Sequence, residues 1–225
     1  MRGSATLLMI AMTALWSPPS AAQDDPAPDP LAPLPDSPSA PGDAARSVLD
    51  WIKASRDNGE LPIIIIDKVA AEALVFDAHG EPLGQTPVLI GSAEGDDSVP
   101  GIGERELGAI PPHERTTPAG RFIARFGPAA GHEKVIWVDW PTAVSLHPVV
   151  TANRKEHRLE RLASPTPDDN RITYGCINVP KRFYGEVIAP LFADRSVTVY
   201  ILPEIRSLSE VFGIQNQAKL LGSAQ

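Results

Sequence analysis

Residues 134–147 read KVIWVDWPTAVSLH, and this stretch decides which class of fold to expect. In its first seven residues, the side chains at 135, 137 and 139 alternate with those at 136, 138 and 140, which is the two-residue period of a β-strand. The segment Ala143–His147 predicts a second, shorter strand that ends at a histidine. His147 is therefore placed for a partly buried site at the end of an apolar strand.

Strand-like runs continue on both sides of this stretch. They occupy Ile63–Asp67, Glu72–Asp77, Thr86–Ile90, Gly120–Phe126 and Ser196–Leu202. A turn is expected at 78–81. Residues 91–112 are rich in glycine, proline and acidic residues, which predicts a long loop of the kind that is often functional. Together the runs predict one mainly β domain that spans residues 61–205.

Helices are expected only around this domain. An N-terminal helix is predicted within residues 44–60, with Asp43 as its cap and Asn58-Gly59 as its end. The charged segment 153–162 and the segment 180–192, with Pro180 in its first turn, predict two more. Residues 206–225 form a C-terminal tail with room for one helix.

The first 22 residues have the layout of a secretory signal peptide: Arg2, an apolar run at 5–16 and small residues at 20–22. The run is shorter than the roughly 20 residues of a spanning helix, which favours cleavage after Ala22 over a retained anchor. Residues 23–43 contain seven prolines in 21 positions and predict an extended linker. We therefore expect an exported, periplasmic protein with no membrane span after cleavage.

Charge and residue types exclude some classes of function. The formal net charge is −8 and no block of lysine and arginine stands out, which argues against nucleic acid as a partner. There is one cysteine, no HExxH motif and no ligand spacing among the histidines, so neither a metal nor another cofactor is expected. We expect a monomer.

Cys176 is the only cysteine of the chain, whereas exported proteins usually hold their cysteines in disulfide pairs. A lone cysteine is a reactive thiol, an intermolecular link or a small buried apolar residue. Gly175 before it permits a tight turn, and the expected helix that follows favours a thiolate. The backbone N–H groups of Tyr174, Gly175 and Cys176 can then converge into an oxyanion hole.

A cysteine nucleophile needs a base within hydrogen-bond reach. The chain offers His79, His113, His132, His147 and His157. The first three lie in predicted turns or the long loop, and His157 lies in a strongly charged segment that predicts exposure to solvent. His147 is the best candidate for the base, and its alternative role is that of a core histidine with satisfied hydrogen bonds.

Three segments, TPAGRF at 117–122, SLH at 145–147 and TYGCIN at 173–178, carry a resemblance. In this order they resemble the motifs of L,D-transpeptidases, the cysteine enzymes of the YkuD-type catalytic domain. These motifs are a TPxGxF strand, a strand-ending catalytic histidine and an [S/T]HGC[I/V][N/R] loop. The resemblance covers about residues 61–203. It implies a β-sandwich or barrel-like domain with a few peripheral helices.

The resemblance also implies an activity in cell-wall biogenesis and cell shape. Cys176 would form a thioester with a peptidoglycan tetrapeptide stem and pass it to an amine acceptor, giving a 3→3 cross-link. His147 would carry the proton, and the carbonyl of Pro148 would orient it. The residues implied to form the oxyanion hole or bind substrate are Arg171, Thr173, Tyr174, Gly175, Asn178 and Pro148.

Three departures from the family pattern stand out. Tyr174 replaces the histidine that stands two residues before the cysteine, and Pro148 replaces a glycine or serine. The segment between His147 and Cys176 is longer than usual, and its insert, residues 149–170, is basic in its first half. The insert predicts a lid or flap that binds carboxylates, or else a solvated helix.

Two further functions remain open for the same fold. An L,D-carboxypeptidase or endopeptidase would share the acyl-enzyme step and use water as its acceptor. A wall-binding domain without activity would keep the fold and lose the chemistry, and Tyr174 is the residue that raises this alternative.

Overall fold

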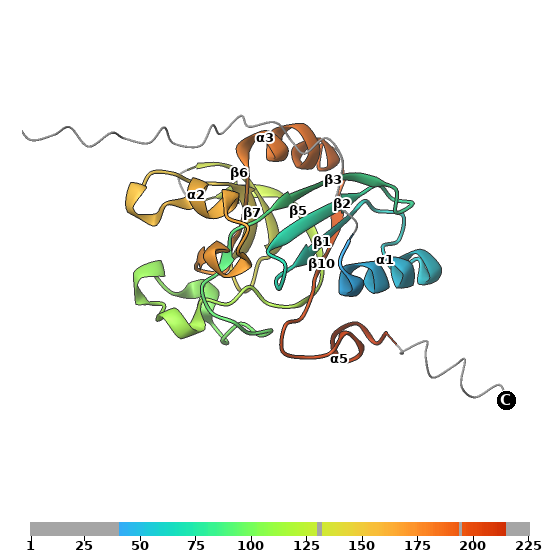
Figure 1. Cartoon of the computed structure of the whole chain (residues 1–225), viewed down its shortest axis with the longest axis horizontal. Helices are drawn as coiled ribbons and strands as arrows, with labels where there is room; N and C mark the ends of the chain where they lie inside the picture. The colour runs from blue at the N-terminus through green and yellow to red at the C-terminus, as the bar shows by residue number, and fades with distance from the viewer. Residues whose placement is uncertain (1–40, 130–131, 194, 215–225) are drawn as a thin grey trace, which may run out of the picture.

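The computed structural model describes residues 41–129, 132–193 and 195–214 (Figure 1). The expected signal peptide at 1–22 and nearly all of the linker at 23–43 lie outside these residues, as do residues 215–225 of the tail. Within the described ranges, no helix combines the length and the apolar character needed to cross a membrane.

An eight-stranded mixed sheet dominates the molecule. Its strands, in spatial order, are β3 (Pro82–Pro87), β2 (Glu72–Phe76), β1 (Ile63–Asp67), β10 (Val197–Ile201), β5 (Gly120–Ala129), β6 (His132–Asp139), β7 (Val144–Pro148) and β9 (Ile177–Val179). The pairs β1–β10 and β7–β9 are parallel, and the other neighbours are antiparallel. The strands β4 (Ile90–Gly91) and β8 (Arg171–Thr173) form a small parallel pair.

The two edges of the large sheet approach each other. Leu89, which follows edge strand β3, exchanges backbone hydrogen bonds of 2.8 and 2.9 Å with Asn178 in the opposite edge strand β9. The sheet is therefore nearly closed into a barrel, which leaves little of either edge unpaired. The expected mainly β fold with a few peripheral helices is confirmed.

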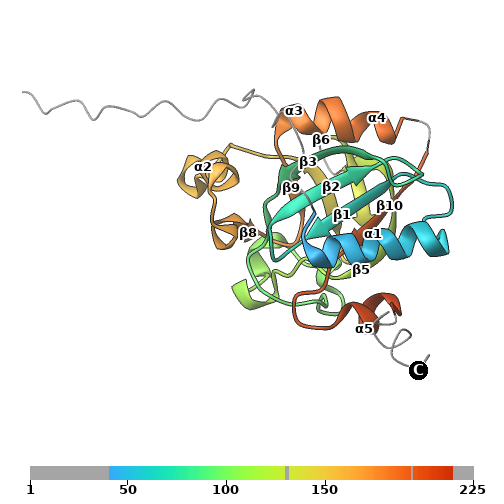
Figure 2. The same cartoon turned by 45° about the vertical axis from the view of Figure 1, so that its right-hand side comes forward.

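The apolar side chains of β1 are buried on both faces of the sheet. Ile64 and Ile66 join the core inside the curved sheet, while Ile63 and Ile65 pack under helix α1 (Asp43–Ser55). This explains why β1 reads as a continuous apolar run rather than an alternating one. Figure 2 shows α1 crossing in front of β1 and β10.

The expected N-terminal helix is α1, but its cap differs from the prediction. Gly42 occupies the cap position, and Asp43 lies in the first turn, where a negative charge favours the helix N-terminus. The helix ends at Ser55, earlier than expected, because Arg56 adopts a left-handed conformation with φ of 55°.

The sequence predicts a single helix over the charged segment 153–162. The structure instead contains a short 3-10 turn followed by a short α-helix. A 3-10 turn η4 (Arg154–Glu156) ends at His157, whose φ of 48° stops helical propagation, and helix α2 (Arg158–Ala163) follows. A further 3-10 turn, η5 (Pro167–Asn170), completes the insert. Helix α2 lies at the end of the molecule away from α1 (Figure 1).

The strand expected at Thr86–Ile90 is instead divided between β3 and β4, while the other helical elements lie close to where the sequence places them. The segment 180–192 is helical, as α3 (Lys181–Phe183), a π-helical turn η6 (Tyr184–Ile188) and α4 (Ala189–Leu191). The π turn ends two residues before Pro190, which has no N–H for an α-helical hydrogen bond. The long loop contains the 3-10 turns η1 (Ile102–Glu104) and η2 (Leu107–Ala109), with η3 (Pro112–Glu114) after them, and the tail contains α5 (Leu208–Phe212).

A buried ion pair fastens the C-terminal segment to the sheet. The Nζ of Lys68 lies 2.9 Å from Oδ1 of Asp96 and donates to the carbonyl of Thr117 at 3.0 Å, and all three residues are buried. Asp96 also accepts the backbone N–H groups of Glu204, Ile205 and Arg206 at 2.6–3.0 Å. Because a buried charge has to be paired, this cluster fixes three segments that are distant in sequence.

Candidate active site

The register of β7 and β9 brings four polar side chains together. Leu146 pairs with Ile177, and His147 pairs with Asn178. Leu146 and Ile177 are fully buried in the core. Since side chains alternate along a strand, Ser145, His147, Cys176 and Asn178 lie on the other face of the sheet.

Cys176 is partly exposed and faces the end of β7. Its Sγ lies 3.4 Å from Oγ of Ser145 and 3.7 Å from the carbonyl oxygen of Ala143, to which the thiol donates. Ser145 is two residues before His147, so the two-residue period of the strand directs both side chains to the thiol. The sequence-based prediction did not include Ser145, although its spacing of two residues from His147 could have identified it.

His147 has a defined tautomer. Its Nδ1 lies 2.9 Å from the carbonyl oxygen of Pro148, which can only accept a hydrogen bond, so Nδ1 carries the proton. Its Nε2 lies 3.1 Å from Nδ2 of Asn178, which can only donate, so Nε2 presents its lone pair. The orienting carbonyl and the base thus have the geometry that a proton acceptor requires.

The thiol and the imidazole shift each other's pKa. Burial by itself raises the pKa of the Cys176 thiol, but hydrogen bonds from His147 and Ser145 outweigh it and lower that pKa below its usual value. Burial likewise opposes the charged form of His147, yet the hydrogen bond and the charge of Cys176 raise the pKa of the imidazole. Both shifts make transfer of the proton from the thiol to the imidazole easier.

The turn before Cys176 depends on Gly175. Its φ is 125°, and a Cβ there would lie 2.8 Å from the carbonyl oxygen of Thr116, so only glycine fits. The hydroxyl of Thr173 accepts the N–H of Gly175 at 3.1 Å and donates to the carbonyl of Cys176 at 2.6 Å. Thr173 is buried, and both of these bonds hold the turn together.

This arrangement corrects part of the predicted oxyanion hole. The N–H of Gly175 is already bonded to Thr173, so it does not converge with its neighbours on one point. The N–H groups of Tyr174 and Cys176 have no acceptor among the residues that the structure describes. These two groups remain available for an oxyanion.

Tyr174 lies under a cation that the sequence-based prediction did not identify. The guanidinium of Arg115 stands 4.0 Å above the centre of its ring, and Nε and Nη2 of Arg115 donate to the carbonyl of Ile110. This contact fixes the plane of the guanidinium beside the turn before Cys176. No local sequence signal distinguishes Arg115. It reaches Tyr174 only because the chain folds back after the long loop.

Arg171, predicted to bind substrate, has a different role. Its Nη2 pairs with the carboxylate of Glu204, which also lies 3.3 Å from Nζ of Lys68, so its charge belongs to the buried ion pair cluster of Lys68 and Asp96. Asn178 and Pro148 contact His147 rather than an open surface. Thr173 thus contacts the turn before Cys176, Asn178 and Pro148 contact His147, and Arg171 contacts Glu204.

The insert reaches the site through one arginine. Nη1 of Arg158 donates to Oδ1 of Asn178 at 2.6 Å, and its Nε donates to Glu156 at 2.5 Å. Arg161 donates to the carbonyl oxygens of Glu156 and Asp169. Arg158 and Arg161, two basic side chains of the insert that was expected to bind carboxylates, are thus already engaged within the protein. The solvated-helix alternative does not describe Arg158 either.

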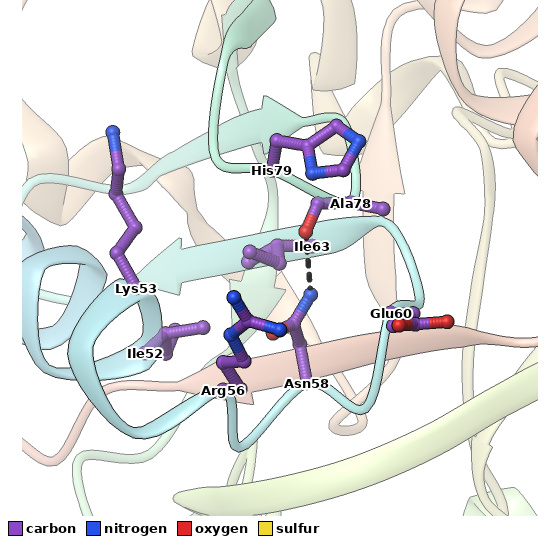
Figure 3. Close-up of a pocket in the computed structure, with 8 residues that line it drawn as sticks. All are labelled: Ile52, Lys53, Arg56, Asn58, Glu60, Ile63, Ala78 and His79. Atoms are coloured by element: carbon purple, nitrogen blue, oxygen red, sulfur yellow. Dashed lines mark hydrogen bonds between the residues drawn. The ribbon is translucent and has the colours of Figure 1, made fainter.

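A hollow of about 510 Å³ lies elsewhere, between the end of α1 and the turn after β2 (Figure 3). Lys53, Arg56 and Glu60 line it, and Asn58 donates to the carbonyl of Ala78 at 2.9 Å across one wall. Its lining contains no cysteine, serine or threonine. It borders β1, which β10, β5 and β6 separate from β7, so it is not part of the site at Cys176.

Comparison with known proteins gives structural similarity only. No protein-family model matches the sequence, and no curated protein matches it. An L,D-transpeptidase from Xylanimonas cellulosilytica DSM 15894 is 12% identical, with a TM-score of 0.40, over 76% of this chain and 64% of that one. Pgp2 from Campylobacter jejuni, a helical cell shape determining protein, is 14% identical, with a TM-score of 0.40, over 70% and 56%.

A third similar structure is the catalytic domain of the E. faecium L,D-transpeptidase. It is 15% identical, with a TM-score of 0.34, and the match covers 64% of this chain and 98% of that one. The chain spans less than two thirds of the length of the first two proteins. Similarity at this level concerns the course of the backbone, and the chemistry has to be judged from the residues around Cys176.

Proposed function

We propose that this protein is an exported cysteine acyltransferase that acts as an L,D-transpeptidase on peptidoglycan stem peptides. One arrangement supports the chemistry: the carbonyl of Pro148 orients His147, and the hydrogen bond of His147 favours the thiolate of Cys176. The resemblance of the segments at 117–122, 145–147 and 173–178 to the transpeptidase motifs supports the substrate class. The signal-like N-terminus supports a site of action in the periplasm.

The first half-reaction forms a thioester. The thiol of Cys176 gives its proton to Nε2 of His147, and the sulfur attacks the carbonyl carbon of the bond between meso-diaminopimelate and D-alanine. The N–H groups of Tyr174 and Cys176 stabilise the oxyanion of the tetrahedral intermediate. The C–N bond then breaks, and D-alanine leaves with the proton from His147.

The second half-reaction transfers the acyl group. An amine from a neighbouring stem attacks the thioester carbonyl while Nε2 of His147 accepts its proton. The C–S bond breaks, the sulfur leaves as a thiolate, and the proton on His147 restores the thiol. The product is a 3→3 cross-link. If water attacks instead, the product is a free tripeptide stem.

The proposal is tested by incubating the purified mature protein with disaccharide tetrapeptides and analysing the products by mass spectrometry. Cross-linked dimers support the transpeptidase, whereas tripeptides alone reassign the protein as a hydrolase. Exposure to a carbapenem is expected to add one adduct, on Cys176, and the Cys176→Ala variant serves as the control. Labelling no faster than that of a free thiol, together with no product, would leave a wall-binding domain as the better description.

A further inference from the structure

The amide of Asn178 is held between an arginine and the candidate base. Its Oδ1 accepts Nη1 of Arg158 at 2.6 Å, and its Nδ2 donates to Nε2 of His147 at 3.1 Å. Asn178 is 1% exposed, so water does not compete for either contact. The chain of contacts therefore runs from the insert, through one buried amide, to the nitrogen that receives the proton of the thiol.

Arg158 decides which end of this amide faces His147. A guanidinium has five donors and no acceptor, so it can only face the oxygen of the amide. The NH2 group is then directed at Nε2 of His147. Without the arginine, the amide is free to turn over and to offer its oxygen to that nitrogen instead.

The two orientations favour opposite protonation states of the imidazole. An NH2 group opposite Nε2 favours the lone pair, whereas an oxygen there favours a protonated Nε2. The other groups that face His147 are the thiol of Cys176 in the turn before β9 and the carbonyl of Pro148, which holds Nδ1. The carboxylate of Glu156 pairs with Arg158 and stabilises its position.

We infer that Arg158 is a positioning residue of the insert: by orienting Asn178, it keeps Nε2 of His147 unprotonated until the thiol delivers its proton. The catalytic role of this Arg158–Asn178–His147 arrangement rests on the proposed function. The arrangement itself concerns only the ionisation of His147. The positive charge of Arg158 acts in the same direction, since it opposes a second cation nearby.

The test is an NMR titration of His147 in the full mature chain. The Cys176→Ala background removes the titrating thiol, and His147→Gln identifies the resonance. We expect Arg158→Met to raise the imidazole pKa and Arg158→Lys, which can still donate to Oδ1, to restore part of the original value. Arg161→Met is the matched control, because Arg161 lies in the same helix and donates only to carbonyls of the insert.

A second comparison separates orientation from charge. In an Asn178→Leu background, Arg158→Met is expected to shift the pKa less than it does beside Asn178, because only the charge of Arg158 remains. Thermal unfolding of each variant identifies those that are misfolded. Equal pKa values for His147 in the Arg158→Met and Arg161→Met proteins would overturn the inference, as would an equal shift in both Asn178 backgrounds.

The activity readout keeps this inference apart from the proposed function. With Cys176 intact, we expect Arg158→Met to slow carbapenem acylation at neutral pH by roughly tenfold, the size of one lost hydrogen bond to a charged group. A protein that shows the His147 shift but never processes muropeptides would disprove the transpeptidase and leave the role of Arg158 standing. A protein that cross-links stems but shows no shift in the pKa of His147 would support the transpeptidase and disprove the role of Arg158.

Discussion

The hydroxyl of Thr117 donates a hydrogen bond of 2.9 Å to the carbonyl oxygen of Gly175, 58 residues away in the sequence. The hydroxyl oxygen of Thr117 also accepts the N–H of Gly91 at 2.9 Å. The threonine of the TPAGRF segment thus supports the turn before Cys176. This hydrogen bond explains physically how the TPAGRF segment contributes to the position of Cys176.

Replacing Thr117 with valine tests this support. The change keeps the shape of the side chain but leaves the N–H of Gly91 and the carbonyl of Gly175 without their buried partner. We expect a loss of about 1–3 kcal/mol in the free energy of unfolding. Urea denaturation measures it, and an unchanged midpoint would show that water or another group replaces the hydroxyl.

Gly175→Ala is expected to cost more than an ordinary glycine substitution. The new Cβ meets the carbonyl oxygen of Thr116 at 2.8 Å in a conformation with φ of 125°. Backbone strain of this kind costs about 1–3 kcal/mol, and displacement of the turn slows alkylation of Cys176. Gly185→Ala is the control, since a Cβ there meets nothing within 4 Å. Similar melting temperatures for the two variants would contradict the prediction.

His147 is expected to set the pH at which Cys176 reacts. Removing it in His147→Ala removes the hydrogen bond and the charge that lower the thiol pKa, so that pKa rises. Iodoacetamide labelling of the wild type should then extend to lower pH than labelling of the variant. Turnover should fall by roughly 10²–10⁴, the usual contribution of a general acid–base group. Superimposable labelling profiles would show that the imidazole does not activate the thiol.

The ion pair between Lys68 and Asp96 is expected to make the stability of the protein sensitive to acid. Burial by itself raises the pKa of Asp96, but the backbone N–H of Arg206, the ammonium of Lys68 and the other donors lower it from 3.8 to about 2. Because the folded pKa lies below the unfolded one, the stabilisation is complete above pH 4 and disappears as pH falls toward 2. We expect a loss of about 2 kcal/mol in the unfolding free energy across that window.

Asp96→Asn checks the origin of this acid sensitivity. The variant cannot ionise, so its stability should change less between pH 4 and 2, although it is less stable at pH 7 because Lys68 loses a buried partner. Urea midpoints at each pH provide the measurement. A wild-type curve that is flat over this range would indicate that the carboxylate is not held in its charged form.

Arg115 is expected to bind a carboxylate of the substrate. Its guanidinium is fixed over Tyr174, and Nη1 has no hydrogen-bond acceptor among the described residues. Arg115→Met should raise KM for a tetrapeptide stem by roughly tenfold and have less effect on its amidated form. Arg105→Met is the control, because Arg105 pairs with Glu114 in the same loop region. Equal effects on both substrates would argue against this role.

The local pattern of the sequence was enough to predict most of the β-strands and to single out Cys176 and His147, whose side chains interact in the structure. Alternation in 134–140 and the apolar run before His147 reflect the two faces of a strand, which neighbouring residues encode by themselves. The register between β7 and β9 is different in kind. It depends on which strands become neighbours in the folded protein. Only the pairing of β7 with β9 places Ser145 and Asn178 beside Cys176 and His147.

The sequence by itself determined the strand period, the lone thiol, the glycine before it and the histidine at a strand end, because each depends on adjacent residues. The tertiary structure decided the roles of Arg171, Arg115 and Arg158. A long charged side chain can reach an ion pair, an aromatic ring or a buried amide, and its sequence position does not distinguish these partners. Pairing across 33 residues gave Arg171 to Glu204, and folding of the insert gave Arg158 to Asn178.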